Sequence, residues 1–354
     1  MKLVQRCAIA WIFIWTACQS SEEKISPQTE NKGRFLYVLN EGLFQHNNAT
    51  LTRYNLDNKI VEKDFFGKVN QQRLGDTGND IGVYGSKLYI LVTVSSQIFV
   101  TERFSAKLIR RIPILNERKL AREPRQMVFH EGKVYVSCFD GNVIVLDTAS
   151  LEIVQTVYSG RNPEGIAIQN QKLYVANSGG KDFPNYDSTL TIFELPTLKL
   201  VKKITIGINP TQIVSTNQIP NRIFICLKGN YSEILQRWIA LNTLADTVLF
   251  FSLQDDLQYL AVDNELWGIK QEHKNIIVKR YNPLSGDLIS SFSPFVEVQT
   301  LYGLDYIKEI KSLVFSDARS FVNTGVVYLC TQTGEITHSF AAELNPAHYA
   351  FINF

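Results

Sequence analysis

The same short apolar phrase returns seven times along the chain, each time at the start of an expected β-strand. The phrases are LYV at Tyr37, LYI at Tyr89, VYV at Tyr135, LYV at Tyr174, IFI at Phe224, LWG at Trp267 and SLV at Leu313. Successive phrases lie 39 to 52 residues apart. A period of about 40–50 residues with several short strands in each unit is typical of a β-propeller. The sequence therefore predicts an all-β fold, a seven-bladed β-propeller.

One unit, residues 163–207, displays the expected blade. Strand-like runs separated by turn residues cover residues 166–168, 173–176, 189–194 and 200–206. Four short antiparallel strands joined by tight turns form one propeller blade.

The two ends of the body predict how the ring closes. Residues 35–38 have the pattern of a second strand with no first strand before it, and residues 346–352 have the pattern of a first strand with nothing after it. We therefore expect the C-terminal strand to join the N-terminal blade, which removes open sheet edges. The propeller is then one domain, residues 34–354.

The start of the chain predicts export. Lys2 and Arg6 precede an apolar run, residues 7–17, that is too short to cross a bilayer as a helix. The run ends in Trp-Thr-Ala-Cys18, which resembles a bacterial lipobox with Trp15 in place of the usual leucine. We expect lipidation at Cys18; an ordinary cleaved signal peptide with an incidental cysteine is the alternative.

The next segment completes the predicted N-terminal organisation. We expect a signal peptide over residues 1–17 and a lipidated, flexible tether over residues 18–33, which lacks an apolar period. Residues 19–24, QSSEEK, resemble the signal that sends lipoproteins of Bacteroidetes to the outer face of the outer membrane. The predicted location is therefore the cell surface, unless this segment is only a solvated tether.

Composition argues against one class of partner. The chain has 36 Lys and Arg against 34 Asp and Glu, and loss of Lys2 and Arg6 with the signal leaves no net charge. Nucleic-acid binding needs a basic surface, so we expect no nucleic-acid partner. A local basic excess at residues 103–125 suits a lipid headgroup, a partner protein or a ligand phosphate, or is a solvated edge strand and loop.

The remaining cysteines predict buried side chains and no disulfide. Cys138, Cys226 and Cys330 lie in apolar strands of three different repeats, and their number is odd. The sequence contains no CxxC or Cys/His spacing typical of zinc sites.

Function is expected on loops, because the strands are committed to packing. In a propeller, the loops between second and third strands and the connections between blades gather on one face. On that face the sequence has long, mixed loops at residues 40–49, 67–79, 177–188 and 316–324, whereas the opposite hairpins are short. Aromatic, amide and carboxyl groups on a wide face suit a large polar organic ligand or a protein partner.

Sixteen residues on this face are the candidate ligand-binding residues. They are Asn40, Glu41, Phe44, Asp76, Asn79, Asp80, Arg125, Arg161, Glu164, Asn177, Phe183, Asn185, Tyr186, Tyr302, Asp317 and Phe321. The residues just before the first strands are expected to rim the channel mouth as a specificity ring or as mutually neutralised turn residues. They are Asp80, Arg125, Glu164, Thr211, Gln258, Tyr302 and Ala347.

The sequence predicts no catalytic residue, no metal site and no cofactor. It contains no GxSxG, P-loop or HExxH motif. Glu41 and Asp317 occupy matching positions in neighbouring blades, so a carboxylate pair for glycoside chemistry remains an alternative. Residues 75–80, GDTGND, do not match an EF-hand loop and suit either calcium or an Asx-type turn.

Several stretches resemble a known family. They are LGDTGNDIGVYGSKLYI (74–90), VANSGGKDFPNYDSTL (175–190), PAHYAFI (346–352) and NEG at residues 40–42. They are similar to the YncE-like seven-bladed surface lipoproteins of Bacteroidetes, and the resemblance spans almost the whole mature chain. The best-defined members are outer-membrane lipoproteins that bind cobalamin and cap a TonB-dependent vitamin B12 transporter.

This resemblance implies cobalamin capture, with cobalamin as the transported ligand and a TonB-dependent transporter as the partner. The matching loops, residues 177–187 and 76–80, are the part of the site that it implies. Two other functions stay open at this point. One is a scaffold or adhesion protein that contacts other proteins at the cell surface, and the other is a propeller lyase or glycoside-active enzyme.

Overall fold

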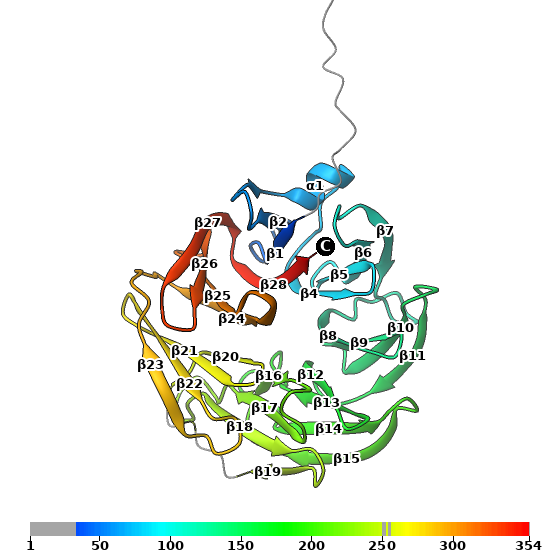
Figure 1. Cartoon of the computed structure of the whole chain (residues 1–354). Coiled ribbons are helices and arrows are strands. Elements are labelled where there is room, and N and C mark those ends of the chain that lie inside the picture. The colour runs from blue at the N-terminus through cyan, green and yellow to red at the C-terminus, as the bar shows by residue number, and fades with distance from the viewer. Residues whose placement is uncertain (1–32, 250–252, 254–255, 354) are drawn as a thin grey trace, which may run out of the picture. The chain divides into compact units, whose positions relative to one another are not determined.

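The computed structural model describes residues 33–249, 253 and 256–353. In these residues 28 strands form seven four-stranded sheets, which follow one another in sequence order around a ring (Figure 1). All neighbouring strands within the sheets are antiparallel, as in the pairing of β13 (Lys172–Asn177) with β14 (Thr189–Glu194). The predicted seven-bladed β-propeller is confirmed.

The strands of the first four blades follow one another from the channel outward. Blade 1 contains β28 (Pro346–Asn353), β1 (Arg34–Asn40), β2 (Thr50–Asn55) and β3 (Val61–Glu62). Blade 2 contains β4 (Gly78–Tyr84), β5 (Lys87–Val92), β6 (Gln97–Glu102) and β7 (Leu108–Pro113). Blade 3 contains β8 (Pro124–His130), β9 (Lys133–Cys138), β10 (Asn142–Asp147) and β11 (Ile153–Tyr158). Blade 4 contains β12 (Pro163–Gln169), β13 (Lys172–Asn177), β14 (Thr189–Glu194) and β15 (Lys199–Thr205).

The remaining blades have the same order. Blade 5 contains β16 (Pro210–Ser215), β17 (Arg222–Leu227), β18 (Arg237–Asn242) and β19 (Thr247–Leu249). Blade 6 contains β20 (Tyr259–Val262), β21 (Leu266–Glu272), β22 (Asn275–Tyr281) and β23 (Leu288–Phe292). Blade 7 contains β24 (Leu301–Ile307), β25 (Ser312–Asp317), β26 (Thr324–Thr331) and β27 (Ile336–Leu344). The short helix α1 (Phe65–Asn70) lies between blades 1 and 2 in the chain, and the 3-10 turn η1 (Lys308–Ile310) joins β24 to β25.

Burial follows the order of the strands within a blade. All seven repeated phrases lie in second strands, and a second strand such as β13 is buried along nearly its whole length. The outer strands β11 and β15 are almost entirely exposed. The strands of blade 4 agree with the predicted ones to within three residues at each end.

The ring closes through the pairing of its last strand with its first. β28 pairs with β1, with Phe35 opposite Ile352 and Tyr37 opposite Ala350, so the red C-terminal strand lies beside the blue N-terminal one (Figure 1). Phe35, Tyr37, Ala350 and Ile352 are buried in one apolar cluster that also includes residues of blade 2. The predicted closure is therefore confirmed, and this seam carries part of the core.

The apolar core is divided among the interfaces between blades. The aromatic residues of the repeated phrases, Tyr37, Tyr89, Tyr135, Tyr174 and Trp267, are almost completely buried. Each cluster draws its residues from neighbouring blades, because a single four-stranded sheet cannot cover its own apolar faces. The stability of the ring therefore depends on contacts between blades.

Tyr174 illustrates such a contact between blades 4 and 5. Its hydroxyl lies 2.9 Å from a carboxylate oxygen of Asp246 and 3.0 Å from the carbonyl oxygen of Thr243. The same carboxylate group accepts a hydrogen bond from Nζ of Lys172, over 2.6 Å. Burial raises the pKa of the Tyr174 hydroxyl well above its usual range, and the nearby Asp246 carboxylate raises it further.

The cysteines and the basic stretch have structural positions. Cys138, Cys226 and Cys330 are free and buried, as predicted. Within the basic stretch, the buried guanidinium of Arg122 donates to Asp140 over 2.5 Å and to Glu117 over 3.0 Å. Part of the basic excess is thus neutralised inside the fold.

The predicted signal peptide, Cys18 and nearly all of the predicted tether lie outside the described residues. Within the described ranges, neither helix has the length and apolar character needed to cross a membrane.

Candidate functional site

A repeated irregularity in the innermost strands directs side chains into the channel mouth. In six of the seven described blades the pairing of the first strand with the second shifts register close to the mouth. An extra residue in one strand of an antiparallel pair bends that strand and redirects a side chain. The second residue of each shifted strand lines one cavity; these residues are Asn79, Arg125, Glu164, Thr211, Tyr302 and Ala347.

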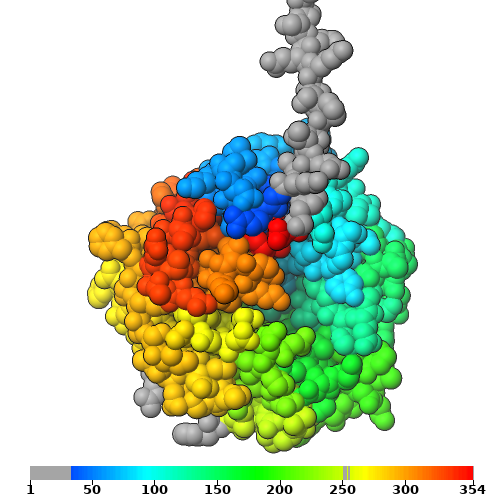
Figure 2. All heavy atoms as spheres, viewed as in Figure 1, coloured from blue at the N-terminus to red at the C-terminus, as the bar shows by residue number. Residues whose placement is uncertain are grey.

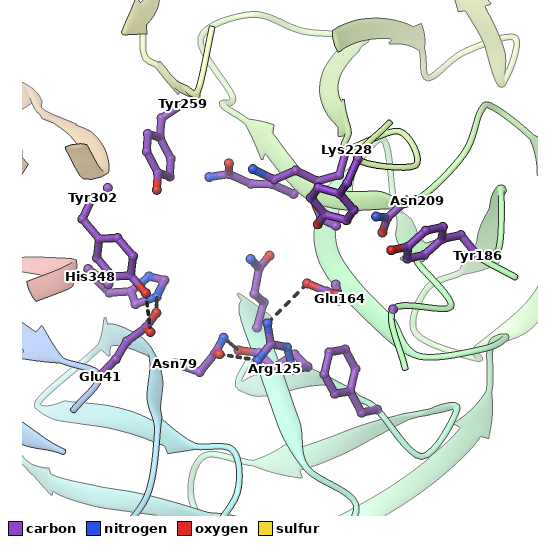
Figure 3. Close-up of a pocket in the computed structure, with 18 residues that line it drawn as sticks. Glu41, Asn79, Arg125, Glu164, Tyr186, Asn209, Lys228, Tyr259, Tyr302 and His348 are labelled. Atoms are coloured by element: carbon purple, nitrogen blue, oxygen red, sulfur yellow. Dashed lines mark hydrogen bonds and ion pairs between the residues drawn. The ribbon is translucent and has the colours of Figure 1, made fainter. Parts of the chain in front are cut away.

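A second set of lining residues follows the second strands. Glu41, Phe139 and Lys228 each come directly after the last residue of β1, β9 and β17. Tyr186 and Tyr231 come from the longer loops of blades 4 and 5. The resulting cavity has a volume of about 430 Å³ and is open at the mouth, and Figure 3 shows Glu41, Lys228 and Tyr186 around it.

The hollow continues along the channel axis. A second cavity of about 340 Å³ is lined by Asp80 and Asp305, and it shares four lining residues with the first: Gln126, Gln212, Ala347 and His348. The space-filling view of the ring shows a depression at its centre (Figure 2). The mouth is therefore the upper part of a deeper polar channel.

One side of the mouth is held by a polar network that crosses three blades. Arg125 donates to Oδ1 of Asn79 over 2.5 Å and to Oε2 of Glu164 over 3.3 Å, and Nδ2 of Asn79 donates to the carbonyl of Arg125 over 2.7 Å. The hydroxyl of Ser178 donates to Oε1 of Glu164 over 3.0 Å. The guanidinium also lies 4.3 Å from the ring centroid of Phe139, a cation–π contact. These contacts fix the positions of Arg125 and Glu164 before any ligand arrives.

The seam between blades 1 and 7 forms another side of the mouth. The hydroxyl of Tyr302 donates to Glu41 over 2.6 Å, and Nε2 of His348 lies 3.8 Å from the same carboxylate group (Figure 3). Burial, together with the charge of Glu41, raises the pKa of the Tyr302 hydroxyl far above its usual range. Tyr302 therefore remains a neutral hydrogen-bond donor at physiological pH.

Two carboxyl groups line the deeper channel. Burial raises the pKa of Asp80 and that of Asp305 to about 6 each. The carboxyl of Asp80 accepts hydrogen bonds from the backbone N–H groups of Ile81 and Met127, over 2.9 and 2.8 Å. Asp305 accepts one from the N–H of Tyr306 over 2.7 Å and remains accessible to water inside the channel.

Aromatic side chains form an exposed ridge beside the mouth, which we call the aromatic ridge and which consists of Phe183, Tyr186 and Tyr231. The ring centroids of Phe183 and Tyr186 are 6.0 Å apart, and those of Tyr186 and Tyr231 are also 6.0 Å apart. Phe183 is 72% exposed and Tyr231 is 69% exposed. The ridge thus presents ring surface to solvent next to the polar cavity.

The structure brings six of the sixteen candidate residues together. Glu41, Asn79, Arg125, Glu164, Tyr186 and Tyr302 line the cavity at the mouth. Asp80 lies one level deeper in the channel, since the register shift after Gly78 gives the rim position to Asn79. Phe183 lies on the aromatic ridge, and Phe321 packs edge-on against Tyr302 with ring centroids 5.9 Å apart.

Four candidates are buried and bonded within the fold. Asn40 and Asn177 end the second strands of blades 1 and 4, and each amide donates to two threonine hydroxyls of the third strand. Asp317 ends the second strand of blade 7, and its carboxylate accepts three backbone N–H bonds over 2.7 to 3.0 Å. Asp76 accepts from the hydroxyl of Thr77 over 2.8 Å. None of these four lines the mouth cavity.

The remaining three candidates lie in loops away from the cavity lining. Arg161 donates to Asp182 over 2.7 Å and to the carbonyl of Asn185 over 2.9 Å, which fastens the long loop of blade 4. Phe44 is exposed on the loop of blade 1. Glu41 and Asp317 do not form the carboxylate pair considered above. In the strand register Asp317 is equivalent to Asn40 and not to Glu41, and its carboxylate accepts hydrogen bonds from backbone N–H groups.

Twelve lining residues were not among the sixteen candidates, although two of them, Thr211 and Ala347, belong to the predicted rim. They are Gln126, Phe139, Gly180, Asn209, Thr211, Gln212, Lys228, Tyr231, Tyr259, Gly303, Ala347 and His348. In blade 6 the side chain that lines the cavity is Tyr259 and not the predicted Gln258, because this blade lacks the register shift found in the other blades. Aligning the second strands of the blades would have identified Phe139 and Lys228. Each follows the residue that pairs with the first residue of the innermost strand, as Glu41 does in blade 1.

Within the ranges that the structure describes, no group of three or more His, Cys, Asp or Glu side chains is arranged to hold a metal ion. The mouth instead offers hydrogen-bond donors and acceptors, charges of both signs and aromatic rings, which together suit non-covalent binding of a polar organic molecule.

Comparison with known proteins agrees with this fold. The chain is similar to the computationally designed Ika8 protein, with 13% identity, a TM-score of 0.53 and coverage of 78% of this chain and 80% of that one. It is also similar to hydrazine synthase of Kuenenia stuttgartiensis, with 14% identity, a TM-score of 0.59 and coverage of 79% and 89%. At these identities the likeness concerns the fold alone. No curated protein matches the sequence.

A family assignment follows from a sequence match that extends from β1 through β17. Residues 33–236, more than half of the chain, match the family described as Domain of unknown function (DUF5074). The chain therefore belongs to the DUF5074 family, within which it forms a seven-bladed β-propeller.

Proposed function

We propose that this protein is a lipid-anchored binding protein of the outer cell surface that captures a large polar organic ligand at the propeller mouth. Cobalamin is the ligand we propose, and a TonB-dependent outer-membrane transporter is the proposed recipient. Binding is non-covalent and requires no reaction, cofactor or metal site.

The observation that carries the proposal is the composition and shape of the mouth. The cavity combines a pre-formed polar network with the aromatic ridge and opens directly to solvent. Cobalamin is too large to be enclosed in a cavity of about 430 Å³, so it would lie across the mouth with its amide side chains reaching the polar groups below. The exposed rings of Phe183 and Tyr231 offer apolar surface on which the ligand could pack.

The segments that carry the family resemblance also support the proposal. The stretch at residues 175–190 supplies Tyr186 to the mouth, and the stretch at residues 74–90 supplies Asn79. The third stretch, residues 346–352, supplies Ala347 and His348. Part of this resemblance therefore lies where the ligand is proposed to bind.

Isothermal titration of the purified protein with cyanocobalamin tests the ligand. We expect saturable binding that weakens in Tyr186→Ala and in Tyr302→Phe, since the first removes a stacking surface and the second removes the donor to Glu41. Phe44→Ala is the matched control, because Phe44 is an exposed loop aromatic that does not line the cavity. Absence of heat at micromolar protein would remove cobalamin as the ligand.

The location and the partner require separate tests. Cys18→Ala should move the protein from the membrane fraction to the soluble fraction if Cys18 carries the anchor. Cross-linking in intact cells should then join the anchored protein to an outer-membrane transporter, and a loss of these adducts on ligand removal would support a transfer complex.

A scaffold or adhesion role is the second candidate, and one observation favours it. Exposed apolar side chains occur in the loops between second and third strands, among them Leu235 at 69% exposure and Val322 at 65%. Such a surface also suits a protein partner. Protein capture that persists in Tyr302→Phe while no small ligand binds would favour this role.

A further inference from the structure

The channel mouth has unlike charges at the same structural position of two blades. Glu41 follows the last residue of β1, and Lys228 follows the last residue of β17. The register confirms the equivalence, because Asn40 pairs with Pro346 just as Leu227 pairs with Pro210. Blades 1 and 5 lie on opposite sides of the ring, so the two charged side chains face the mouth from opposite sides (Figure 3).

The two groups differ in how far the protein already neutralises them. Glu41 accepts a hydrogen bond from Tyr302 over 2.6 Å and lies 3.8 Å from Nε2 of His348. Arg125, another cation of the lining, is bound to the carboxylate of Glu164. Lys228 donates only to the neutral amide of Gln236, over 2.8 Å, and among the described residues no carboxylate lies within ion-pair distance of it.

Gln236 holds Lys228 in place and leaves N–H donors of the Lys228 ammonium group free. Its Nε2 atom donates to the carbonyl oxygens of Leu257 and Gln258, over 2.7 and 3.2 Å, while its Oε1 atom accepts from Lys228. An ammonium group has three donors, so two remain for a ligand. The lysine is therefore positioned by a fixed amide, partly buried, with its ammonium group extending toward the opening.

The neighbouring strand of blade 5 contributes a second donor. Gln212 lines both the mouth and the deeper channel, and its side-chain amide makes no hydrogen bond to another described residue. The register shift between Pro210 and Gln212 places this side chain beside the end of β17, where Lys228 begins the loop. Blade 5 thus presents an ammonium and an amide without an acidic residue in the cavity lining.

We propose that Lys228, assisted by Gln212, binds an anionic oxygen group of the ligand, either a phosphate or a carboxylate. The inference rests on the proposed function and adds an orientation to it. The anionic end of the ligand lies on blade 5, and hydrogen-bond donors of the ligand lie toward Glu41 on blade 1. In cobalamin the only such anion is the phosphodiester of the nucleotide arm.

Two corrinoids separate recognition of the anion from recognition of the ring. Cyanocobalamin carries the phosphodiester, whereas dicyanocobinamide lacks the nucleotide and its phosphate. We expect Lys228→Met to weaken cyanocobalamin binding by about 10–100-fold, the range for a lost hydrogen bond to a charged group, and to leave dicyanocobinamide binding nearly unchanged. The dependence of cyanocobalamin affinity on salt should become weaker in the same variant.

Two control variants define the effect. Lys228→Arg keeps the charge and should retain most of the affinity. Lys308→Met removes an exposed lysine from η1, in a first-to-second-strand hairpin on the opposite face, and should change neither affinity. Equal losses for both corrinoids in Lys228→Met, or no loss for either, would overturn the inference while leaving cobalamin binding intact.

A probe that does not depend on cobalamin tests the same residue. In protein labelled with 15N-lysine, the side-chain signal that is absent from Lys228→Met should shift saturably on addition of inorganic phosphate. If the unmodified protein binds no cyanocobalamin, the ligand proposal fails and this titration alone decides the inference. A Lys228 signal that does not respond to phosphate would then refute it.

Discussion

Tyr174 offers a direct measure of how strongly neighbouring blades hold each other. Tyr174→Ala removes a fully buried ring and should cost about 3–5 kcal/mol of unfolding free energy, as other large aromatic truncations do. Tyr174→Phe keeps the ring and removes only the hydroxyl that lies 2.9 Å from Asp246. Loss of a hydrogen bond to a charged group costs about 1.5–3 kcal/mol, so the hydroxyl should account for roughly half of the full effect.

Urea denaturation followed by tryptophan fluorescence gives both values. The midpoint should fall in the order unmodified protein, Tyr174→Phe, Tyr174→Ala at a constant slope. Asp246→Asn combined with Tyr174→Phe should reveal a coupling energy of about 0.5–3 kcal/mol, because the two groups are in contact. A Tyr174→Phe variant as stable as the unmodified protein would refute the assigned link between blades 4 and 5.

Tyr186→Ala is the matched comparison for this series. Tyr186 belongs to the aromatic ridge and contacts other loop aromatics, so its loss should change stability by no more than about 0.5 kcal/mol. Its ligand affinity should fall instead. If Tyr186→Ala destabilises the protein as much as Tyr174→Ala, Tyr186 is a packing residue and the site has been placed wrongly.

Three further changes test other parts of the ring. Ile352→Ala truncates a side chain of the closing seam that is only 3% exposed and should cost about 2–5 kcal/mol of unfolding free energy; an unchanged urea midpoint would contradict a stabilising role for the seam. Arg122→Met leaves the carboxylate of Asp140 without its 2.5 Å partner and should cost about 3 kcal/mol in the same assay. Asp305, whose pKa is raised from 3.8 to about 6, favours the folded state most below pH 4 and loses that contribution as pH rises through 6. Asp305→Asn should therefore stabilise the protein at pH 7 and lose this effect below pH 4. We expect a gain of about 1 kcal/mol, less than the full pKa shift would give, because water in the channel screens the carboxylate. A gain that does not depend on pH would contradict the assignment.

The fold was predictable because the same buried position of the second strand recurs in successive blades and requires a large apolar side chain each time. Tyr37, Tyr89, Tyr135 and Tyr174 occupy the same buried place in four successive blades, and residues of this kind set the period that the sequence displays. The closure was also predictable. Residues 346–352 have the pattern of a first strand, and the second strand with which they pair, β1, lies at the other end of the propeller domain. Local pattern and global arrangement agree at these positions.

The site was predictable only in part, because register shifts of one residue decide which side chain faces the channel. Asp80 was expected at the rim, but the bulge after Gly78 gives that position to Asn79. Asn40 and Asp317 are polar residues near the mouth whose side chains turn back to satisfy threonine hydroxyls and backbone N–H groups. Composition does not distinguish a polar residue that faces a cavity from one that caps a strand.

Lys228 was missed for a different reason. Its loop is less rich in turn residues than the loop at residues 177–188, and the isolated lysine follows an apolar strand without a motif. Only the alignment of second strands across blades shows that Lys228 has the position in blade 5 that Glu41 has in blade 1. Aligning repeats by strand register is therefore the sequence-level step that would have found it.

The pairing of Arg34 with Asn353 has a consequence for how the ring folds. These partners are separated by 319 positions, the difference between their numbers, so blade 1 lacks its innermost strand until residues 346–353 are available to pair. Long-range pairing of this kind is slow to form and leaves an unpaired strand edge during folding. We therefore expect the ring to close only after the other six blades have formed, because the strand that completes blade 1 lies farthest along the sequence from its partner.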